Sequence, residues 1–265
     1  MGDLPLIGNG PDRVLHPGAA PCVGRVSARR AVPGQHESSG SDGTDTGFGD
    51  PSIQGQRYAS DGSAQGDQFQ VNTYTTSEQA FSSVAANAAG KFVVVWESYG
   101  SDGTDDSRRS VHGQRFAADG SPQGPEFQVN SHTTDNQIYS DVTLLTDGDF
   151  VVVWEHEDWT DSSNSGVRAQ RYTSDGSPLG NEFQVNTYTT GIQRSASVAA
   201  LPAGRFVVAW TSEPSPGTDT SYGSIQGQRF VQPPAVPALS NATRFALGAV
   251  MLLGAAHALR RRAAR

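Results

Sequence analysis

Acidic side chains recur at equivalent points along this chain, and their oxygens could bind a cation. The carboxylates lie within a few residues of one another in Gly-rich segments, and they are Asp42, Asp45, Asp102, Asp105 and Asp106. Calcium binds about six to eight oxygen ligands of this kind. The full spacing of an EF-hand loop is absent, so solvated acidic turns compete with this interpretation. The sequence therefore predicts no cofactor, with calcium as the one alternative.

A second candidate is the segment His156-Glu157-Asp158-Trp159, which departs from its counterparts Ser-Tyr-Gly-Ser and Ser-Glu-Pro-Ser. A unique site needs groups that occur once, and an acid, an imidazole and an indole could bind a carbohydrate or transfer a proton. The chain has no Gly-x-Ser-x-Gly, no His-Glu-x-x-His and no phosphate-binding Gly loop. We therefore expect a ligand-binding cluster formed by His156, Glu157, Asp158 and Trp159, and we expect the protein not to be an enzyme.

The elements that must position these residues form a tandem repeat. The run Phe-Val-Val-Val-Trp occurs twice and a close variant once, so that Trp96, Trp154 and Trp210 lie 58 and 56 residues apart. Four strand signals follow one another in each unit. The first occupies 81–85, 139–143 and 195–199; the second 91–97, 149–155 and 205–211; the third 52–58, 110–116, 166–172 and 224–230; the fourth 69–72, 127–130 and 183–186.

Gly turns at positions 90, 148 and 204 connect the first two signals as hairpins, and Asp-Gly turns follow the third. The second signal is apolar on both faces, so it needs cover on both sides. We expect an all-β fold of tandem four-stranded antiparallel repeats, similar to a β-propeller and incomplete at about three blades. A linear β-solenoid is the competing architecture.

Two polar residues recur in every unit where their strand is present. The arginines end the third strand, and we expect a structural role for them, such as pairing with a repeated carboxylate like Glu97 or Glu155; a ligand-facing ring of arginines is the alternative. They are Arg57, Arg115, Arg171 and Arg229. The asparagines end the fourth strand, and we expect them to bond the backbone of the next turn; they are Asn72, Asn130 and Asn186.

Composition divides the chain into a head (1–36), an array (37–232), a Pro-rich spacer (233–241) and an apolar tail (242–265). The array holds 25 acidic and 10 basic side chains, so it repels phosphate backbones and nucleic acid is not an expected partner. The single cysteine, Cys22, allows no internal disulfide and does not decide the compartment.

The array begins in mid-unit, because residues 37–45 match residues 97–105 while no Phe-Val-Val-Val-Trp run precedes them. One hypothesis is that residues 1–36 replace lost repeat sequence through a shifted frame or a misplaced start. The alternative is a natural irregular head. No secretory signal peptide is visible in it.

The tail combines an apolar run at 245–259 with an Arg-rich end that includes Arg260, Arg261 and Arg262. We expect a transmembrane helix over 242–265 with this end in the cytoplasm, which places the array outside. A buried or amphipathic terminal helix is the alternative.

The repeat resembles a family of bacterial secreted and surface repeat proteins with Phe-Val-Val-Val-Trp, Gly-Gln-Arg-Phe, Asp-Gly and Phe-Gln-Val-Asn units. The tail resembles C-terminal sorting signals of the PEP-CTERM and IPTL-CTERM class, which exosortase-type enzymes process. Its sorting motif is Val236, Pro237, Ala238, Leu239 and Ser240. The chain lacks Pro-Glu-Pro and the aromatic residue usual after the motif.

These features predict an exported, membrane-anchored protein of the cell envelope or cell surface. Its expected role is binding, adhesion or structure, with an extracellular glycan or protein as ligand and an exosortase-type enzyme as partner. Two alternatives stay open: a propeller-type hydrolase acting on glycans, and a truncated, inactive remnant of a longer repeat protein.

Overall fold

The computed structural model describes residues 52–100, 108–157, 165–214 and 222–231, together with the backbone of 27–29. All regular elements in these ranges are β-strands. None of the described residues forms a helix long and apolar enough to cross a membrane. The helix expected over 242–265 lies outside the described residues.

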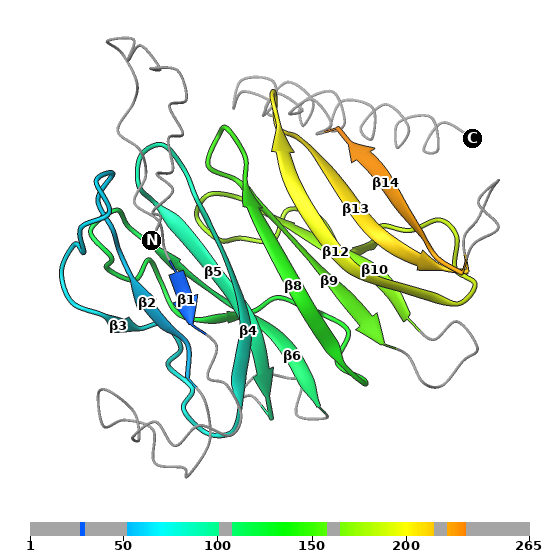
Figure 1. Ribbon diagram of the computed structural model, residues 1–265, viewed down its shortest axis with the longest axis horizontal. Coiled ribbons are helices and arrows are strands. Elements are labelled where there is room, and N and C mark those ends of the chain that lie inside the picture. Colours follow the sequence, from blue (N-terminus) through cyan, green and yellow to red (C-terminus); the bar gives the residue numbers. More distant parts are fainter. Residues whose placement is uncertain (1–26, 30–51, 101–107, 158–164, 215–221, 232–265) are drawn as a thin grey trace, which may run out of the picture. The chain divides into compact units, whose positions relative to one another are not determined.

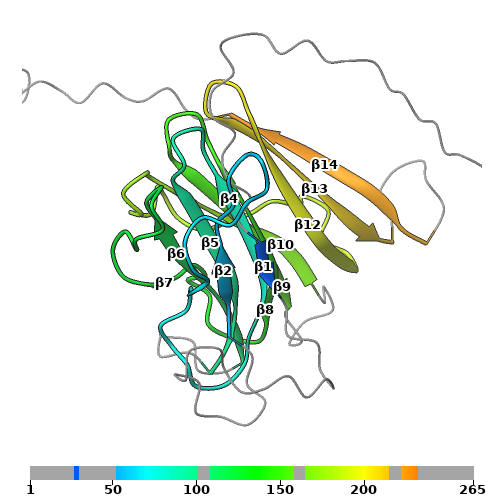
Figure 2. The ribbon, with the colours of Figure 1, turned by 60° about the vertical axis from the view of Figure 1, so that its left-hand side comes forward.

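The described strands form four antiparallel sheets (Figures 1 and 2). The first contains β1 (Ser27–Arg29), β2 (Gln54–Gln56) and β3 (Phe69–Gln70). The second contains β4 (Gln79–Ala86), β5 (Phe92–Tyr99), β6 (Arg109–Phe116) and β7 (Phe127–Gln128). The third contains β8 (Gln137–Leu144), β9 (Phe150–Glu157), β10 (Ser165–Tyr172) and β11 (Phe183–Gln184). The fourth contains β12 (Ile192–Leu201), β13 (Arg205–Glu213) and β14 (Ser224–Phe230).

The order of strands within each sheet follows the order of signals in each repeat. The hairpins β4–β5 and β8–β9 turn at Gly90 and Gly148, whose φ angles of +81° and +90° suit glycine. In the Asp-Gly turns the aspartate accepts a hydrogen bond from the amide two residues on, as Asp119 does from Ser121 at 2.9 Å. The predicted all-β fold of four-stranded antiparallel repeats is confirmed, with two full sheets and two three-stranded ones in the described part.

Neighbouring sheets pack through the second strand of each repeat. Alternate side chains of β5 belong to different cores: Val94 and Trp96 pack with Ile53 of the sheet before, while Val93 and Val95 pack with the sheet after. β9 repeats this arrangement between the second and fourth sheets. Both faces of these strands are therefore covered, which explains why their sequence is apolar without alternation.

The fourth sheet differs because, within the described residues, only one face of β13 is covered. Phe206, Val208 and Trp210 enter a shared core with the third sheet. On the other face, Ala209 is exposed and Val207 is only partly buried.

The head contributes one element to the described structure. β1 pairs antiparallel with β2, in register from Ser27 with Gln56 to Arg29 with Gln54. In the other sheets that place beside the third strand belongs to the Phe-Val-Val-Val-Trp strand.

Candidate functional site

The first strand of each repeat, here called the inner strand, contains a bulge at the same position. β8 lies between β4 and β12 and contacts both of them (Figure 1), and each of the three strands shifts register against its partner strand at this point. The first bulge residues have left-handed backbone, with φ of +53° at Phe81, +53° at Tyr139 and +55° at Ser195. Aromatic residues rarely adopt this conformation, so the bulges place Phe81 and Tyr139 at a conformational cost.

A carboxylate from the preceding repeat holds each later bulge. Glu97 of β5 accepts a hydrogen bond from the amide of Tyr139 at 2.7 Å. Glu155 of β9 accepts one from the amide of Ser195 at 3.3 Å. These bonds join neighbouring sheets, so the bulge geometry depends on packing between repeats.

Burial is the largest influence on the pKa values of Glu97 and Glu155. It raises the pKa of Glu97 to about 7, although hydrogen bonding and the charge of Arg109 act in the opposite direction. It raises the pKa of Glu155 to about 7 as well, against the hydrogen bond from Ser195. Each carboxyl group is therefore partly protonated near neutral pH, whereas an exposed glutamate is ionised there.

Arg109 extends this arrangement to the aromatic residues. Its guanidinium bonds Glu97 at 3.1 Å and Glu78 at 2.6 Å, and it lies 5.9 Å from the ring centroid of Phe81. The Phe81 ring meets Tyr139 edge to face, with centroids 5.6 Å apart. Tyr139 remains 49% exposed, so its ring is available to solvent.

Asp141 joins the inner strands of three repeats. Its carboxylate accepts hydrogen bonds from the hydroxyls of Ser83 at 2.7 Å and Ser197 at 3.0 Å, and from the amide of Val198 at 2.9 Å. Ser83 and Ser197 occupy the same repeat position as Asp141, so one carboxylate stands where the other repeats have hydroxyls. We use the name inner-strand site for Phe81, Arg109, Tyr139 and Asp141 with these two serines.

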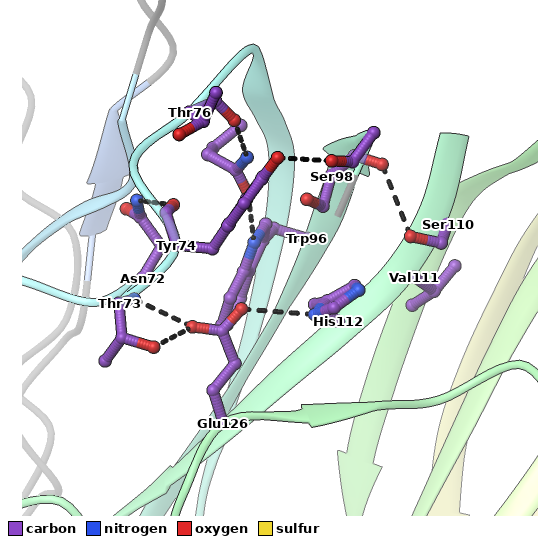
Figure 3. A network of polar contacts seen from close by, with 12 residues as sticks. Asn72, Thr73, Tyr74, Thr76, Trp96, Ser98, Ser110, Val111, His112 and Glu126 are labelled. Atoms are coloured by element: carbon purple, nitrogen blue, oxygen red, sulfur yellow. Dashed lines mark hydrogen bonds and ion pairs between the residues drawn. The ribbon is translucent and has the colours of Figure 1, made fainter. Parts of the chain in front are cut away.

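A buried Trp–Gln pair fixes the start of each inner strand. Trp96 donates from Nε1 to Oε1 of Gln79 at 3.0 Å (Figure 3), and equivalent bonds join Trp154 to Gln137 at 3.1 Å and Trp210 to Gln193 at 3.2 Å. Gln79 lies two residues before Phe81. The indole that marks the repeat in sequence thus positions the bulge in structure.

Figure 3 also shows the carboxylate of Glu126, which links two parts of the chain. Glu126 accepts hydrogen bonds from the amide and hydroxyl of Thr73, both at 2.7 Å, and contacts Nδ1 of His112 at 3.1 Å. Its pKa is lowered, because these hydrogen bonds outweigh an opposing desolvation effect. Glu182 makes the same two bonds to Ser131. These contacts hold the connections into β4 and β8.

The predicted cluster at 156–159 is only partly described. His156 is buried, with Nδ1 3.0 Å from Oε1 of Gln137 and its ring edge-on to His132 at 4.5 Å. Glu157 accepts a hydrogen bond from Asn136 at 2.8 Å. Asp158 and Trp159 lie outside the described residues, so the structure does not bring the four side chains together.

Other residues of predicted sites also lie outside the described residues. These are the calcium candidates Asp42, Asp45, Asp102, Asp105 and Asp106, the sorting motif 236–240, and Arg260–Arg262. Within the described ranges, no three His, Cys, Asp or Glu residues group as a metal site would require. The cation and sorting sites stay predictions.

The recurring asparagines behave as predicted. Asn130 donates to the carbonyl of His132 at 2.8 Å, and its side-chain oxygen also accepts from the amide of Val111 at 2.8 Å. The same pair of bonds occurs at Asn72 and Asn186.

The pairing predicted for the recurring arginines is wrong. Arg57 donates to the carbonyl of Ala118 and Arg115 to that of Ser174, so each reaches the Asp-Gly turn of the next repeat. Glu97 pairs instead with Arg109, which occurs in one repeat only. The third strand carries its arginine at the end far from Glu97, since Val93 and not Glu97 lies opposite Arg115.

Sequence reasoning missed the inner-strand site, although one signal for it was present. Asp141 breaks the repeat where Ser83 and Ser197 keep it, and a unique group is what a single site requires. The contacts that reveal its position span 56 to 58 residues and leave no local motif.

No protein-family model matches the sequence, and no curated protein matches it. Several solved structures resemble the fold at low identity, including the following three. A thermostable family-43 glycoside hydrolase is 10% identical with a TM-score of 0.39, and the match covers 69% of each chain. A GH43 endo-arabinanase from Bacillus licheniformis is 12% identical with a TM-score of 0.38, covering 69% of this chain and 66% of that one. An endo-1,4-beta-xylanase from Bacteroides thetaiotaomicron is 10% identical with a TM-score of 0.37, covering 72% and 68%.

These matches correct one prediction. The sequence predicts that the protein is not an enzyme, whereas the three similar structures are glycoside hydrolases. That prediction rested on missing local motifs, and a site assembled from several strands leaves none. We withdraw the exclusion of catalysis and take no substrate or mechanism from these matches.

Proposed function

We propose that this protein binds glycans at the inner-strand site. The observation that supports this most directly is Tyr139, which is 49% exposed although its backbone has a φ of +53°. A residue with a small side chain adopts this left-handed backbone conformation at lower cost, as Ser195 does in the next repeat. An exposed ring held at such a cost is typical of a functional position.

The groups around Tyr139 suit a sugar. An aromatic ring offers a flat apolar surface for the C–H face of a pyranose, and Phe81 supports that ring from the side. Asp141 and the hydroxyls of Ser83 and Ser197 offer acceptors and donors for sugar hydroxyls. Apolar surface with a few polar groups is the usual composition of a small-molecule site.

A matched pair of tyrosines tests the proposal. The protein is applied to a glycan array, and calorimetry then measures the affinity of the best glycan. Tyr139→Ala is expected to weaken binding at least tenfold. Tyr222→Ala removes a tyrosine that is 83% exposed just before β14, outside the inner-strand site, and it should leave the affinity unchanged. Absence of any glycan ligand, or equal losses in both variants, would reject glycan binding at this site.

Glycan hydrolysis is a second candidate, favoured by one observation. Glycosidases use a carboxylic acid that is protonated at working pH together with an ionised carboxylate. The pKa values of Glu97 and Glu155 near 7 supply the first kind of group beside the inner strands. Asp141 supplies a carboxylate among them. In this scheme Glu155 would donate its proton to the leaving oxygen as the glycosidic bond breaks, while Asp141 would take a proton from the water that attacks the anomeric carbon.

Turnover of the bound glycan separates the two candidates. Release of reducing ends is measured with the native protein, Glu155→Gln and Asp141→Asn. Hydrolysis predicts a loss of at least a hundredfold in kcat in both variants, with binding retained in Glu155→Gln. Binding without turnover in the native protein would restrict the function to recognition.

The tail sequence supports a location at the cell envelope for this glycan-binding array. The apolar run at 245–259 and Arg260–Arg262 would hold it at the membrane with the array outside. Cell fractionation of the full chain and of a variant ending at residue 232 tests this. We expect the full chain in the membrane fraction and the shortened chain outside it. Equal distribution would contradict anchoring by the tail.

A further inference from the structure

The edge strand β14 has the sequence of an already paired strand in the same chain. Residues 224–229 read Ser-Ile-Gln-Gly-Gln-Arg, identical to residues 52–57. β2, within that earlier segment, pairs with β3, where Gly55 lies opposite Phe69. β14 pairs with β13 alone among the described strands, and it lies at the edge of its sheet in both views (Figures 1 and 2).

An apolar side chain of β14 is exposed where the equivalent strands have a buried one. Ile225 is 74% exposed, whereas its counterparts Ile53, Val111 and Val167 are 2%, 0% and 0% exposed. Ile53 packs in a core with Val71, which follows β3, and with Val94 and Trp96 of the next sheet. An apolar side chain that is covered in three repeats and open in the fourth marks a place for the missing cover.

The glycine of this strand shows the same difference at atomic detail. A Cβ on Gly55 would lie 2.6 Å from the ring of Phe69, and one on Gly113 would lie 2.8 Å from the ring of Phe127. Among the described residues, a Cβ on Gly227 would meet only the carbonyl of Val208, at 3.5 Å. The space above Gly227 is therefore open where the other two glycines each carry a phenylalanine ring.

Backbone groups complete the match. The amides of Ile53, Val111 and Val167 bond the side-chain oxygens of Asn72, Asn130 and Asn186, at 2.7 to 2.8 Å. Each asparagine ends a Phe-Gln-Val-Asn segment. No such segment follows Phe230, since the sequence continues Val-Gln-Pro-Pro. Proline lacks an amide hydrogen and is unsuited to pairing along a strand.

We propose that the β14 edge binds an extended peptide segment of another chain, with the pattern Phe-x-Val-Asn, by adding it as a fourth strand. The phenylalanine ring covers Gly227, the valine covers Ile225, and the asparagine bonds the amide of Ile225. Backbone pairing gives affinity and the three side chains give selectivity, as in other strand-addition complexes. A partner of this chemistry is another repeat protein of the same type that presents an unpaired fourth strand.

The test uses the full chain and a synthetic peptide with the sequence of residues 182–188, which contains Phe183, Val185 and Asn186. Binding is followed by calorimetry and by NMR of the labelled protein. We expect saturable binding with the largest shifts in residues 224–230. Replacing the phenylalanine or the valine of the peptide by serine should weaken binding at least tenfold.

Variants of the protein locate the site. Ile225→Asp and Gly227→Leu should each weaken peptide binding at least tenfold, and both positions are open enough that folding should be retained, which circular dichroism checks. Leu179→Asp makes a comparable change at a residue that is 36% exposed in the loop between β10 and β11, and it should leave binding unchanged.

Several results would overturn the proposal. They are no binding, binding that ignores the peptide sequence, or binding that survives both β14 variants. Self-association through β14 would show that a second copy of this chain occupies the edge. Binding only after removal of residues 232–265 would show that the chain's own tail covers it.

Discussion

Glu97 accepts a hydrogen bond from the main-chain amide of Tyr139 at 2.7 Å, although the two residues belong to neighbouring sheets. The bond connects a buried carboxyl group to the bulge that presents an exposed ring. Glu155 repeats the contact at Ser195, one unit later. Stability between repeats and the geometry of the inner-strand site thus depend on the same two side chains.

Stability should fall as pH rises from about 5 to 8. Burial raises the pKa of Glu97 and Glu155 from the usual 4.5 to about 7, so the folded chain binds more protons than the unfolded chain between these values. The stabilisation is full below about pH 4.5 and is lost as pH passes 7. Thermal unfolding at a series of pH values measures this. Glu97→Gln with Glu155→Gln keeps an acceptor at both sites and should flatten the profile, whereas an unchanged slope would assign it to other groups.

Loss of one indole hydrogen bond should be costly. Trp96→Phe removes the donor to Gln79, which is 1% exposed and would keep a buried acceptor without that partner. We expect about 1–3 kcal/mol less stability from this, with a further loss from the smaller ring. Urea unfolding of Trp96→Phe, Gln79→Met and the double variant gives the coupling energy. Additive effects would show that the two side chains stabilise the fold independently.

The strands were predictable from sequence because their cause is local. Phe92 to Trp96 is apolar at every position, and this composition indicates a strand covered on both faces before any neighbour is known. The roles of Asn130 and its equivalents were partly predictable for the same reason, since the bond to the carbonyl of His132 spans two residues.

The candidate site was not predictable in this way. The serines that bond Asp141 lie 58 and 56 residues away in the sequence. Glu97 forms its ion pair with Arg109 and not with one of the recurring arginines. Both sets of contacts depend on how neighbouring sheets pack and on which residues of adjacent strands lie opposite each other. A comparison of repeats identifies Asp141 as unique, but the pattern does not place it beside Ser83 and Ser197.

We expect the side-chain oxygen of Asn186 to account for most of the stability that this side chain contributes. Asn186 accepts from the amide of Val167 and donates to the carbonyl of Tyr188, both at 2.8 Å. Asn186→Ala leaves the Val167 amide, in a fully buried residue, without this acceptor and should cost about 1–3 kcal/mol. Asn186→Asp keeps the acceptor oxygen and should cost less. Equal losses by chemical denaturation would place the main contribution on the donor side.

The bulge at Tyr139 allows binding to be separated from folding. The left-handed conformation costs a non-glycine residue about 1–2 kcal/mol, and glycine loses about 0.5–1 kcal/mol in backbone entropy on folding. Tyr139→Gly should therefore change the free energy of unfolding by no more than about 1 kcal/mol, while glycan affinity falls at least tenfold. Ser195→Gly is the matched control, because its φ of +55° is nearly the same and it carries no ring. It should show a similar change in stability with full glycan affinity. If Tyr139→Gly binds as well as the native protein, the exposed ring has no part in recognition, and the cost of its conformation needs another cause.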